Sequence, residues 1–237
     1  ITPSLACLVQ KEIGANCPAM DVNGACSGFI YGLDVAAAML ASGRARHILL
    51  LAAEGITRLA DWSDRSTCVL FGDGAGAAVL GQGEDLLFMH VTSDGWAEPL
   101  NAPYPSSRYP SLPPKKAAPP YLYMDGQEIY KFAVNSICAN LKMAMEATGL
   151  APEAVDHVLL HQANVRIIDA ARKRLGIPEE RYAINIQNVA NMSAATIPVL
   201  MDECNRAGRF APGDILLMSG FGAGLTTGTA VLRWSQP

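Results

Sequence analysis

The order of apolar and polar residues along the chain predicts helices that alternate with buried strands. An alanine-rich segment from about Cys26 to Ser42 predicts a helix that ends at Gly43. The sequence "RARHILLLAAE" follows directly, and its continuous apolar run is typical of a strand buried on both faces. A helix followed closely by a buried strand is typical of a layered α/β core.

The second half of the chain shows the same kind of pattern. "GQEIYKFAVNSICANLKMAMEATG" predicts a long helix that ends at Gly149, and "PEAVDHVLLHQ" predicts a short approach and a buried strand. "NVRIIDAARKRLG" and "SAATIPVLMDECNRAG" predict two amphipathic helices, and "GDILLMSGFGAG" and "LTTGTAVLRW" predict two strands joined by a glycine turn.

A glycine-rich stretch, "FGDGAGAAVLGQG" from Phe71 to Gly83, resembles a dinucleotide-binding loop at first sight. That loop follows a strand and opens a helix. Here the glycines lead into the strand-like "AAVL", so we interpret the stretch as a tight turn where two backbones approach closely.

Two segments of the chain have a similar order of features. "CSGFIYGLDVAAAMLASGRARHILLLAAE" and "MSAATIPVLMDECNRAGRFAPGDILLMSG" each run from small residues through a helix and a glycine into a strand, and a glycine-rich turn and strand follow both. This degenerate repeat predicts two similar halves packed face to face, residues 1–93 and 124–237. Cys26 and Asn191 then occupy nearly corresponding helix-start positions in the two halves.

An irregular insertion at 94–123 separates the predicted halves. Eight of the fifteen prolines lie between Pro99 and Pro120. Such a segment is either a solvated linker or a lid or partner-binding loop.

Composition narrows the class of protein. The chain has 237 residues, 50% of them hydrophobic, and a net charge of −4, which predicts a large core and argues against nucleic acid as a partner. Six cysteines without regular spacing favour a reducing cytoplasm. Neither a long apolar run nor a signal peptide is present, so we expect a soluble cytoplasmic protein without membrane insertion. The chain begins at Ile1 just before a predicted helix, so we expect an upstream segment to be missing.

Cys26 is a candidate nucleophile because it lies between small residues at a helix start. Amide groups and the helix dipole there favour an anion and lower the pKa of a thiol. A buried cysteine packed as a small apolar residue is the alternative. The pair His157 and His161 suits zinc only on a helix, and the strand context without a nearby acidic ligand argues against a metal site.

Five motifs in order carry a family resemblance: "NGACSGF", "FGDGAGAAVL", "LLHQANVRII", "NVANMSAAT" and "GFGAGLTTGTAVLRW". Together they resemble β-ketoacyl-acyl carrier protein synthase III, over essentially the whole chain. The resemblance implies a thiolase-like α/β fold of two similar halves in five layers, α-β-α-β-α, usually as a homodimer. Against the family pattern the first half lacks its opening strands and helices, which are then absent or supplied by a separate N-terminal segment.

The resemblance also implies an activity. Family members condense an acyl-coenzyme A primer, most simply acetyl-coenzyme A, with malonyl-acyl carrier protein and so initiate fatty acid biosynthesis. The coenzyme A thioester is a substrate, and no other cofactor is implied.

The resemblance assigns a catalytic set to Cys26, His161 and Asn191. Cys26 forms the acyl-enzyme, and the amides of Cys26 and Ala223 form the oxyanion hole. The family often has glycine at the position of Ala223, and alanine restricts the backbone there. His161 and Asn191 donate hydrogen bonds to the thioester oxygen during decarboxylation. The structural alternatives are a hydrogen-bonded core histidine and a helix-capping asparagine.

Further side chains are placed around the site by resemblance alone. Phe221 is a gate beside the nucleophile, Arg65 contacts the coenzyme A nucleotide, and Asn164 contacts the pantetheine. Met124 and Tyr130 line the substrate channel. Arg166 is a carrier-docking position, and Thr2 belongs to the segment that reaches the partner subunit's acyl pocket. Ordinary core packing for the phenylalanine and solvation for the arginines are the alternatives.

Two rival functions stay open from the sequence. A related acyltransferase, or a condensing enzyme of specialised polyketide-type metabolism, would use the same cysteine, although Asn191 is not needed for simple acyl transfer. A non-catalytic interaction fragment is the second rival, and the presence of Cys26 argues against it.

Overall fold

The computed structural model describes residues 2–102 and 121–235. The helices are α1 (Leu5–Glu12), α2 (Gly28–Ala41), α3 (Gly126–Thr148), α4 (Val165–Leu175), α5 (Ile186–Val189) and α6 (Thr196–Arg206). The strands are β1 (His47–Gly55), β2 (Asp73–Gly81), β3 (Leu86–Ser93), β4 (Leu100–Asn101), β5 (Tyr123–Met124), β6 (His157–Leu160), β7 (Ile215–Gly222) and β8 (Thr226–Arg233). Short 3-10 turns are η1 (Ala25–Ser27), η2 (Ile56–Leu59), η3 (Pro152–Ala154), η4 (Glu179–Arg181) and η5 (Ser193–Ala195).

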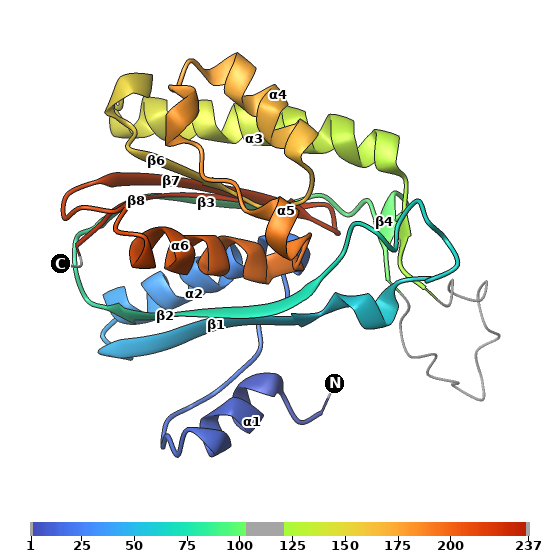
Figure 1. Cartoon of the computed structure of the whole chain (residues 1–237). Helices are drawn as coiled ribbons and strands as arrows, with labels where there is room; N and C mark the ends of the chain where they lie inside the picture. Colours follow the sequence, from blue (N-terminus) through green and yellow to red (C-terminus); the bar gives the residue numbers. More distant parts are fainter. Residues whose placement is uncertain (1, 103–120, 236–237) are drawn as a thin grey trace.

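The elements stack in layers of alternating helix and sheet (Figure 1). Helices α3 and α4 cover one face of a four-stranded sheet, and α2 and α6 cover its other face. Beyond α2 and α6 lies the antiparallel pair β1–β2, with α1 on its far side. The α-β-α-β-α order predicted for the chain is confirmed.

The four-stranded sheet joins parts of the chain that are far apart in sequence. Its order is β3-β8-β7-β6, with β6 parallel to β7 and the other neighbours antiparallel. Strand β3 lies within 1–93 but pairs with β8. The division at 93 and 124 stays a prediction, and one strand before that boundary contributes to the sheet after it.

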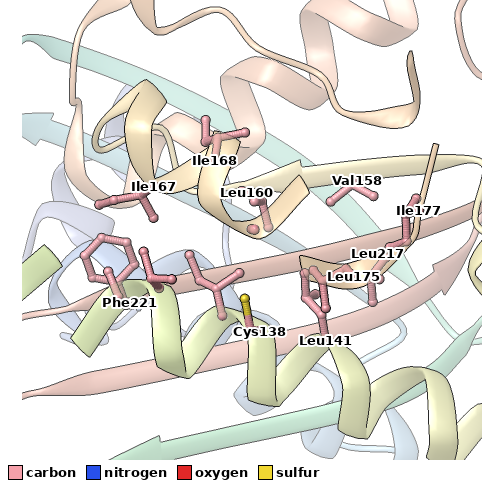
Figure 2. Packing of buried hydrophobic residues seen from close by; sticks show 14 of the residues in the cluster. Cys138, Leu141, Val158, Leu160, Ile167, Ile168, Leu175, Ile177, Leu217 and Phe221 are labelled. Carbon is pink, nitrogen blue, oxygen red and sulfur yellow. The ribbon is translucent and has the colours of Figure 1, made fainter. Parts of the chain in front are cut away.

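Apolar side chains fill the space on both faces of this sheet. Figure 2 shows the cluster beneath α3 and α4, where Leu141 and Ile168 from the helices meet Val158 and Leu217 from the strands. Each of these four side chains is fully buried, which contributes about 1.5–3 kcal/mol for a side chain of this size. A second cluster packs α2 and α6 between the two sheets.

Local signals set the ends of the helices as the sequence predicts. Asp125 accepts hydrogen bonds from the N–H groups of Gln127 and Glu128 at the start of α3, both at 3.1 Å. Gly149 ends the same helix with φ 67°, a conformation that favours glycine. The long helix and its predicted end are therefore confirmed.

The glycine-rich stretch after Phe71 is a strand rather than the predicted tight turn. Gly74 and Gly76 lie within β2, and a Cβ atom added to Gly76 would lie 2.9 Å from the backbone nitrogen of Val199 in α6. The predicted close approach of backbones is present. Glycine is needed here because a helix packs directly on the strand, not because the chain reverses.

The Pro-rich insertion begins and ends in a small antiparallel pair. Leu100 of β4 faces Met124 of β5, so its two ends lie side by side. Residues 103–120, which hold most of its prolines, lie outside the described part of the chain, and the choice between linker and lid stays open. Within residues 2–102 and 121–235, none of the helices combines the length and apolar character needed to span a membrane.

Candidate active site

The turns that precede α2 and α6 meet at the end of β7, where small residues let the backbones approach. A Cβ atom added to Gly222 would lie 2.6 Å from the nitrogen of Cys26. One added to Gly220 would lie 3.6 Å from both the Cβ of His161 and the Cα of Ser27. The nucleophile predicted on η1 and the histidine that follows β6 therefore flank the same strand.

The two turns repeat one backbone arrangement. Asn23 Oδ1 accepts a hydrogen bond from the N–H of Ala25 at 3.1 Å, and Asn191 Oδ1 accepts one from the N–H of Ser193 at 2.9 Å. Ala25 and Ser193 have φ angles of 48° and 51°, which residues other than glycine seldom adopt. Such strained positions are typical of functional sites.

This repeat corrects the predicted near-correspondence of Cys26 and Asn191. Asn191 matches Asn23, and Ala194 takes the position of Cys26 in the second turn. The hydrogen-bonded asparagine marks the repeated turn, and the cysteine follows it. The pseudo-symmetry nevertheless brings η1 and η5 into contact, since a Cβ on Gly28 would lie 3.3 Å from the Cβ of Ala194.

Burial controls the acidity of the Cys26 thiol. Its pKa is raised to about 11, chiefly by desolvation; the Ser193 side chain opposes this shift and the carboxylate of Glu54 adds to it. The prediction that the helix start holds this thiol as an anion is therefore wrong for the substrate-free protein. Cys26 lies on the three-residue η1 turn, and there desolvation outweighs the stabilising amides.

His161 is buried next to a hydroxyl group. Its Nδ1 lies 2.6 Å from Thr196 Oγ1, and its buried Nε2 has no partner among the described residues. Burial lowers the pKa of the ring to about 3, so the imidazole is neutral at pH 7. The ring is only 1% exposed, and its unpartnered nitrogen is the feature that a fully satisfied core histidine would lack.

Asn191 is held by its own backbone. Its N–H donates to the carbonyl of Leu70 at 2.9 Å, and its carbonyl accepts from the N–H of Gly72 at 3.0 Å. The bond that Oδ1 accepts from Ser193 fixes the orientation of the amide, and the NH2 group has no hydrogen-bond partner in the described part of the chain. This side chain is therefore set up as a hydrogen-bond donor.

Phe221 and Ala223 lie at the end of β7 and just after it. The Phe221 ring packs edge-on against His161, with 5.4 Å between centroids, and also belongs to the apolar cluster shown in Figure 2. Ala223 lies in the turn before β8, where its carbonyl accepts from Thr226 Oγ1 at 3.1 Å. Its chain neighbour Gly222 lies against the backbone of η1.

The other predicted residues lie farther out. Arg166 and Tyr130 line a surface recess of about 420 Å³ between α3 and α4, together with Asp169, Lys173 and Arg174. Asn164 caps α4 by accepting from the N–H of Arg166 at 3.0 Å.

Three predicted positions have no described contact with the catalytic set. Met124 lies on β5 and packs against the cluster beneath α3. Arg65 and Thr2 are exposed, the first in a turn after η2 and the second before α1. The strand context expected for His157 is confirmed, and its Nε2 lies 2.9 Å from Asp214.

Three residues of the site were not identified from the sequence. Thr196 contacts His161, Ser193 interacts with Cys26, and Glu54 ends the apolar run of β1 beside them. The only sequence signal for them was Glu54, which ends the apolar segment "HILLLAAE", because charged side chains are seldom buried unless they have a partner or a function.

Comparison with known proteins agrees with this architecture. Family models for 3-oxoacyl-(acyl-carrier-protein) synthase III match residues 20–95, and those for its C-terminal part match 145–234. The chain is 40% identical to β-ketoacyl-(acyl-carrier-protein) synthase III of Clostridium acetobutylicum over 239 residues, covering 99% of the chain and 74% of the relative.

Solved structures agree as well. The synthase III of Thermus thermophilus superposes with a TM-score of 0.92 at 41% identity, covering 100% of this chain and 74% of that one. The priming β-ketosynthase of the R1128 polyketide pathway gives 0.89 at 35% identity, covering 100% and 72%. The expected loss of the opening part of the fold is not borne out by these comparisons.

The layered fold is that of the thiolase-like condensing enzymes. Within that class, the chain belongs to the β-ketoacyl-acyl carrier protein synthase III family. It is a condensing acyltransferase.

Proposed function

We propose that this protein condenses an acyl-coenzyme A primer, acetyl-coenzyme A in the simplest case, with malonyl-acyl carrier protein. The observation that carries the proposal is that the turn holding the thiol packs against the turn that follows the asparagine and against β7, whose Gly220 also lies beside the imidazole. Cys26, His161 and Asn191 supply these groups from three separate segments.

The first step transfers the primer to the protein. Cys26 Sγ forms a bond to the acyl carbon, the bond from that carbon to the coenzyme A sulfur breaks, and the thiol proton is released. The amides of Cys26 and Ala223 stabilise the tetrahedral oxyanion in this proposal. Because the pKa of the thiol is about 11, loss of its proton has to accompany substrate binding or attack.

The second step forms the new carbon–carbon bond. Loss of carbon dioxide from the malonyl group leaves its electron pair on the α-carbon, with charge developing on the thioester oxygen. His161 and Asn191 donate to that oxygen as uncharged groups. The carbanion attacks the acyl group on Cys26, whose sulfur leaves and takes up a proton.

The outer residues fit the two substrates in this proposal. Arg166 marks the docking site of the acidic carrier protein, in a recess it shares with Lys173 and Arg174. Arg65, Asn164, Met124 and Tyr130 contact coenzyme A or line the acyl channel. We further propose a homodimer in which Thr2 reaches the partner's acyl pocket, a cytoplasmic location, and no cofactor beyond the thioester substrate.

Condensation in polyketide-type metabolism is the second candidate function. The similarity to a priming β-ketosynthase of a polyketide pathway supports it. The chemistry at Cys26, His161 and Asn191 is the same in both cases, so a panel of acyl-coenzyme A primers and carrier proteins distinguishes them.

Variants at two positions test the assigned roles. Cys26→Ala should abolish formation of the acyl adduct from acetyl-coenzyme A and retain some decarboxylation of malonyl-acyl carrier protein. Asn191→Ala should form the adduct and lose decarboxylation. Intact-protein mass spectrometry and carbon dioxide release are the two readouts.

The outcomes separate the rival functions. Absence of an adduct on wild-type protein would reject both enzymatic functions, and an adduct that never condenses would favour simple acyl transfer. The reverse pattern in the two variants would show that the roles are assigned wrongly.

A further inference from the structure

The two nitrogen atoms of the His161 ring have different surroundings. Nδ1 lies 2.6 Å from Thr196 Oγ1, and the buried Nε2 has no hydrogen-bond partner among the described residues. The ring is held in place by the edge-on contact with Phe221, and Gly220 lies beside its Cβ. A neutral imidazole carries one proton, so the nitrogen that holds it decides whether Nε2 donates or accepts a hydrogen bond.

The ring holds a single proton because nothing in its surroundings favours a second one. His161 is 1% exposed, and none of the ion pairs in the described part of the chain includes it. Burial lowers its pKa to about 3. The contact with Thr196 therefore has one of two directions: either the hydroxyl donates to Nδ1, or an N–H at Nδ1 donates to the hydroxyl oxygen.

The hydrogen bonds around Thr196 favour donation by the hydroxyl. This group has two acceptors within reach, His161 Nδ1 at 2.6 Å and the carbonyl of Ser193 at 3.0 Å. The Ser193 carbonyl already accepts from the backbone N–H of Thr196, whereas Nδ1 has no other donor among the described residues. Donation to Nδ1 therefore leaves neither buried acceptor without a partner.

The length of the contact favours the same direction. Hydrogen bonds from N–H to oxygen usually span about 2.7–3.2 Å, and bonds from a hydroxyl group to oxygen span about 2.5–3.0 Å. The 2.6 Å between Nδ1 and Thr196 Oγ1 is too short for the first range and lies within the range typical of a hydroxyl donor. The proton between the two atoms is thus the hydroxyl proton of Thr196.

We propose that Thr196 is a positioning residue that fixes the tautomer of His161. Its hydroxyl donates to Nδ1 and so holds the single ring proton on Nε2. This role rests on the proposed function, in which His161 donates to the thioester oxygen during decarboxylation. In the other tautomer Nε2 would present a lone pair, which would repel the negative charge that develops on that oxygen.

The position of Thr196 in the chain links it to the second donor of the site. Thr196 is fully buried and begins α6, directly after the η5 turn. The same turn supplies the Ser193 N–H that donates to Asn191 Oδ1 at 2.9 Å and so orients the Asn191 amide. One short segment therefore sets the hydrogen-bonding direction of both the amide and the imidazole.

Nitrogen-15 NMR of the substrate-free protein, labelled in its histidines, tests the proposal directly at pH 7. A ring nitrogen that carries a proton shows a one-bond coupling to it, and a bare nitrogen does not. The His161 signals are assigned by their absence from the spectrum of His161→Gln. We expect the proton of wild-type His161 on Nε2. A wild-type ring with its proton on Nδ1 would overturn the proposal, whatever the activity of the protein.

Two variants of Thr196 connect the tautomer to the reaction. Thr196→Val keeps the shape of the side chain and removes the donor, so both tautomers should be populated. Decarboxylation of malonyl-acyl carrier protein should then fall about 10- to 100-fold. Acylation of Cys26 should persist, because His161 has no assigned part in it. Thr196→Ser keeps the hydroxyl and should restore both the Nε2 proton and most of the rate. A Thr196→Val protein with the wild-type ring spectrum would contradict the proposal.

A matched control separates this effect from the general loss of a hydroxyl group. Thr148→Val removes a hydroxyl that donates to the Ala144 carbonyl at 2.7 Å near the end of α3, and it should change neither the His161 spectrum nor the rate. If Thr196→Val does not fold, the spectra of wild-type protein and of Thr196→Ser still decide the tautomer. Wild-type protein with the proton on Nε2 that fails to decarboxylate malonyl-acyl carrier protein would reject the proposed function and not the tautomer.

Discussion

At Cys26 and His161, burial acts on two titratable groups in opposite directions. It raises the pKa of the thiol to about 11 and lowers that of the imidazole to about 3. Both groups are therefore neutral at pH 7. Neutral groups are less costly to bury than ions, because neither has to be stripped of water as a charged group.

The free thiol should therefore react slowly. At pH 8 about one Cys26 side chain in a thousand is a thiolate, and the fraction rises roughly tenfold per pH unit. Alkylation of Cys26 by iodoacetamide, followed on its peptide by mass spectrometry, should increase without a plateau up to pH 10. A plateau below pH 9 would show that the thiol is an anion near neutrality. Cys7 and Cys17 are exposed and serve as internal comparisons.

Among the secondary-structure elements, β2 shows how packing selects residues against local preference. Its glycines weaken the strand on their own, yet α6 and η5 lie directly against them. A side chain at Gly76 would meet the backbone of α6, which cannot move away as a flexible side chain could.

Gly76→Ala should therefore lower the free energy of unfolding by about 1–3 kcal/mol, measured by urea denaturation. Gly126→Ala is the matched control, because no atom lies within 4 Å of its added Cβ and alanine favours the start of α3. We expect that control to be neutral or slightly stabilising. Equal stability of the two variants would mean that α6 can shift away from β2.

The same comparison shows which elements could be predicted from the sequence. Helices with a clear apolar period and a capping glycine, such as α3 with Gly149, follow from local signals. The strand that begins at the glycines of β2 cannot be predicted from local signals, because these glycines are explained only by contact with a helix that is distant in sequence. The pairing of β3 with β8 also depends on long-range contacts that no local pattern specifies.

For the candidate site, the order of motifs was enough to select Cys26, His161 and Asn191. Their environment was not predictable in the same way. The direction in which the pKa of the thiol shifts depends on how deeply the fold buries Cys26, and the effects of Ser193 and Glu54 on it depend on which segments the fold brings together. Sequence patterns identify reactive side chains more readily than they identify the neighbouring groups that shift the pKa values of those side chains.

Over the whole molecule, charge is distributed unevenly. The chain has a net charge of −4, yet Arg166, Lys173 and Arg174 line one recess beside α4. A local basic surface on an acidic protein speeds encounter with an acidic partner at low salt.

Arg166→Glu should raise KM for malonyl-acyl carrier protein several-fold, with the effect weakening at high salt, and leave KM for acetyl-coenzyme A unchanged. Steady-state kinetics at two ionic strengths give the measurement. Arg44→Glu, at an exposed position after α2, makes the same change of charge elsewhere. Equal effects of both variants would assign the change to net charge and not to docking in the recess.

Strand β3 interlaces the two parts of the chain. It precedes the Pro-rich segment, yet its ladder runs along β8, the last strand of the molecule. Neither part can unfold alone without breaking the hydrogen bonds between β3 and β8, so heating should give one cooperative transition. For the same reason, cleavage by a protease between the two parts should leave two fragments that stay folded and associated through the pairing of β3 with β8.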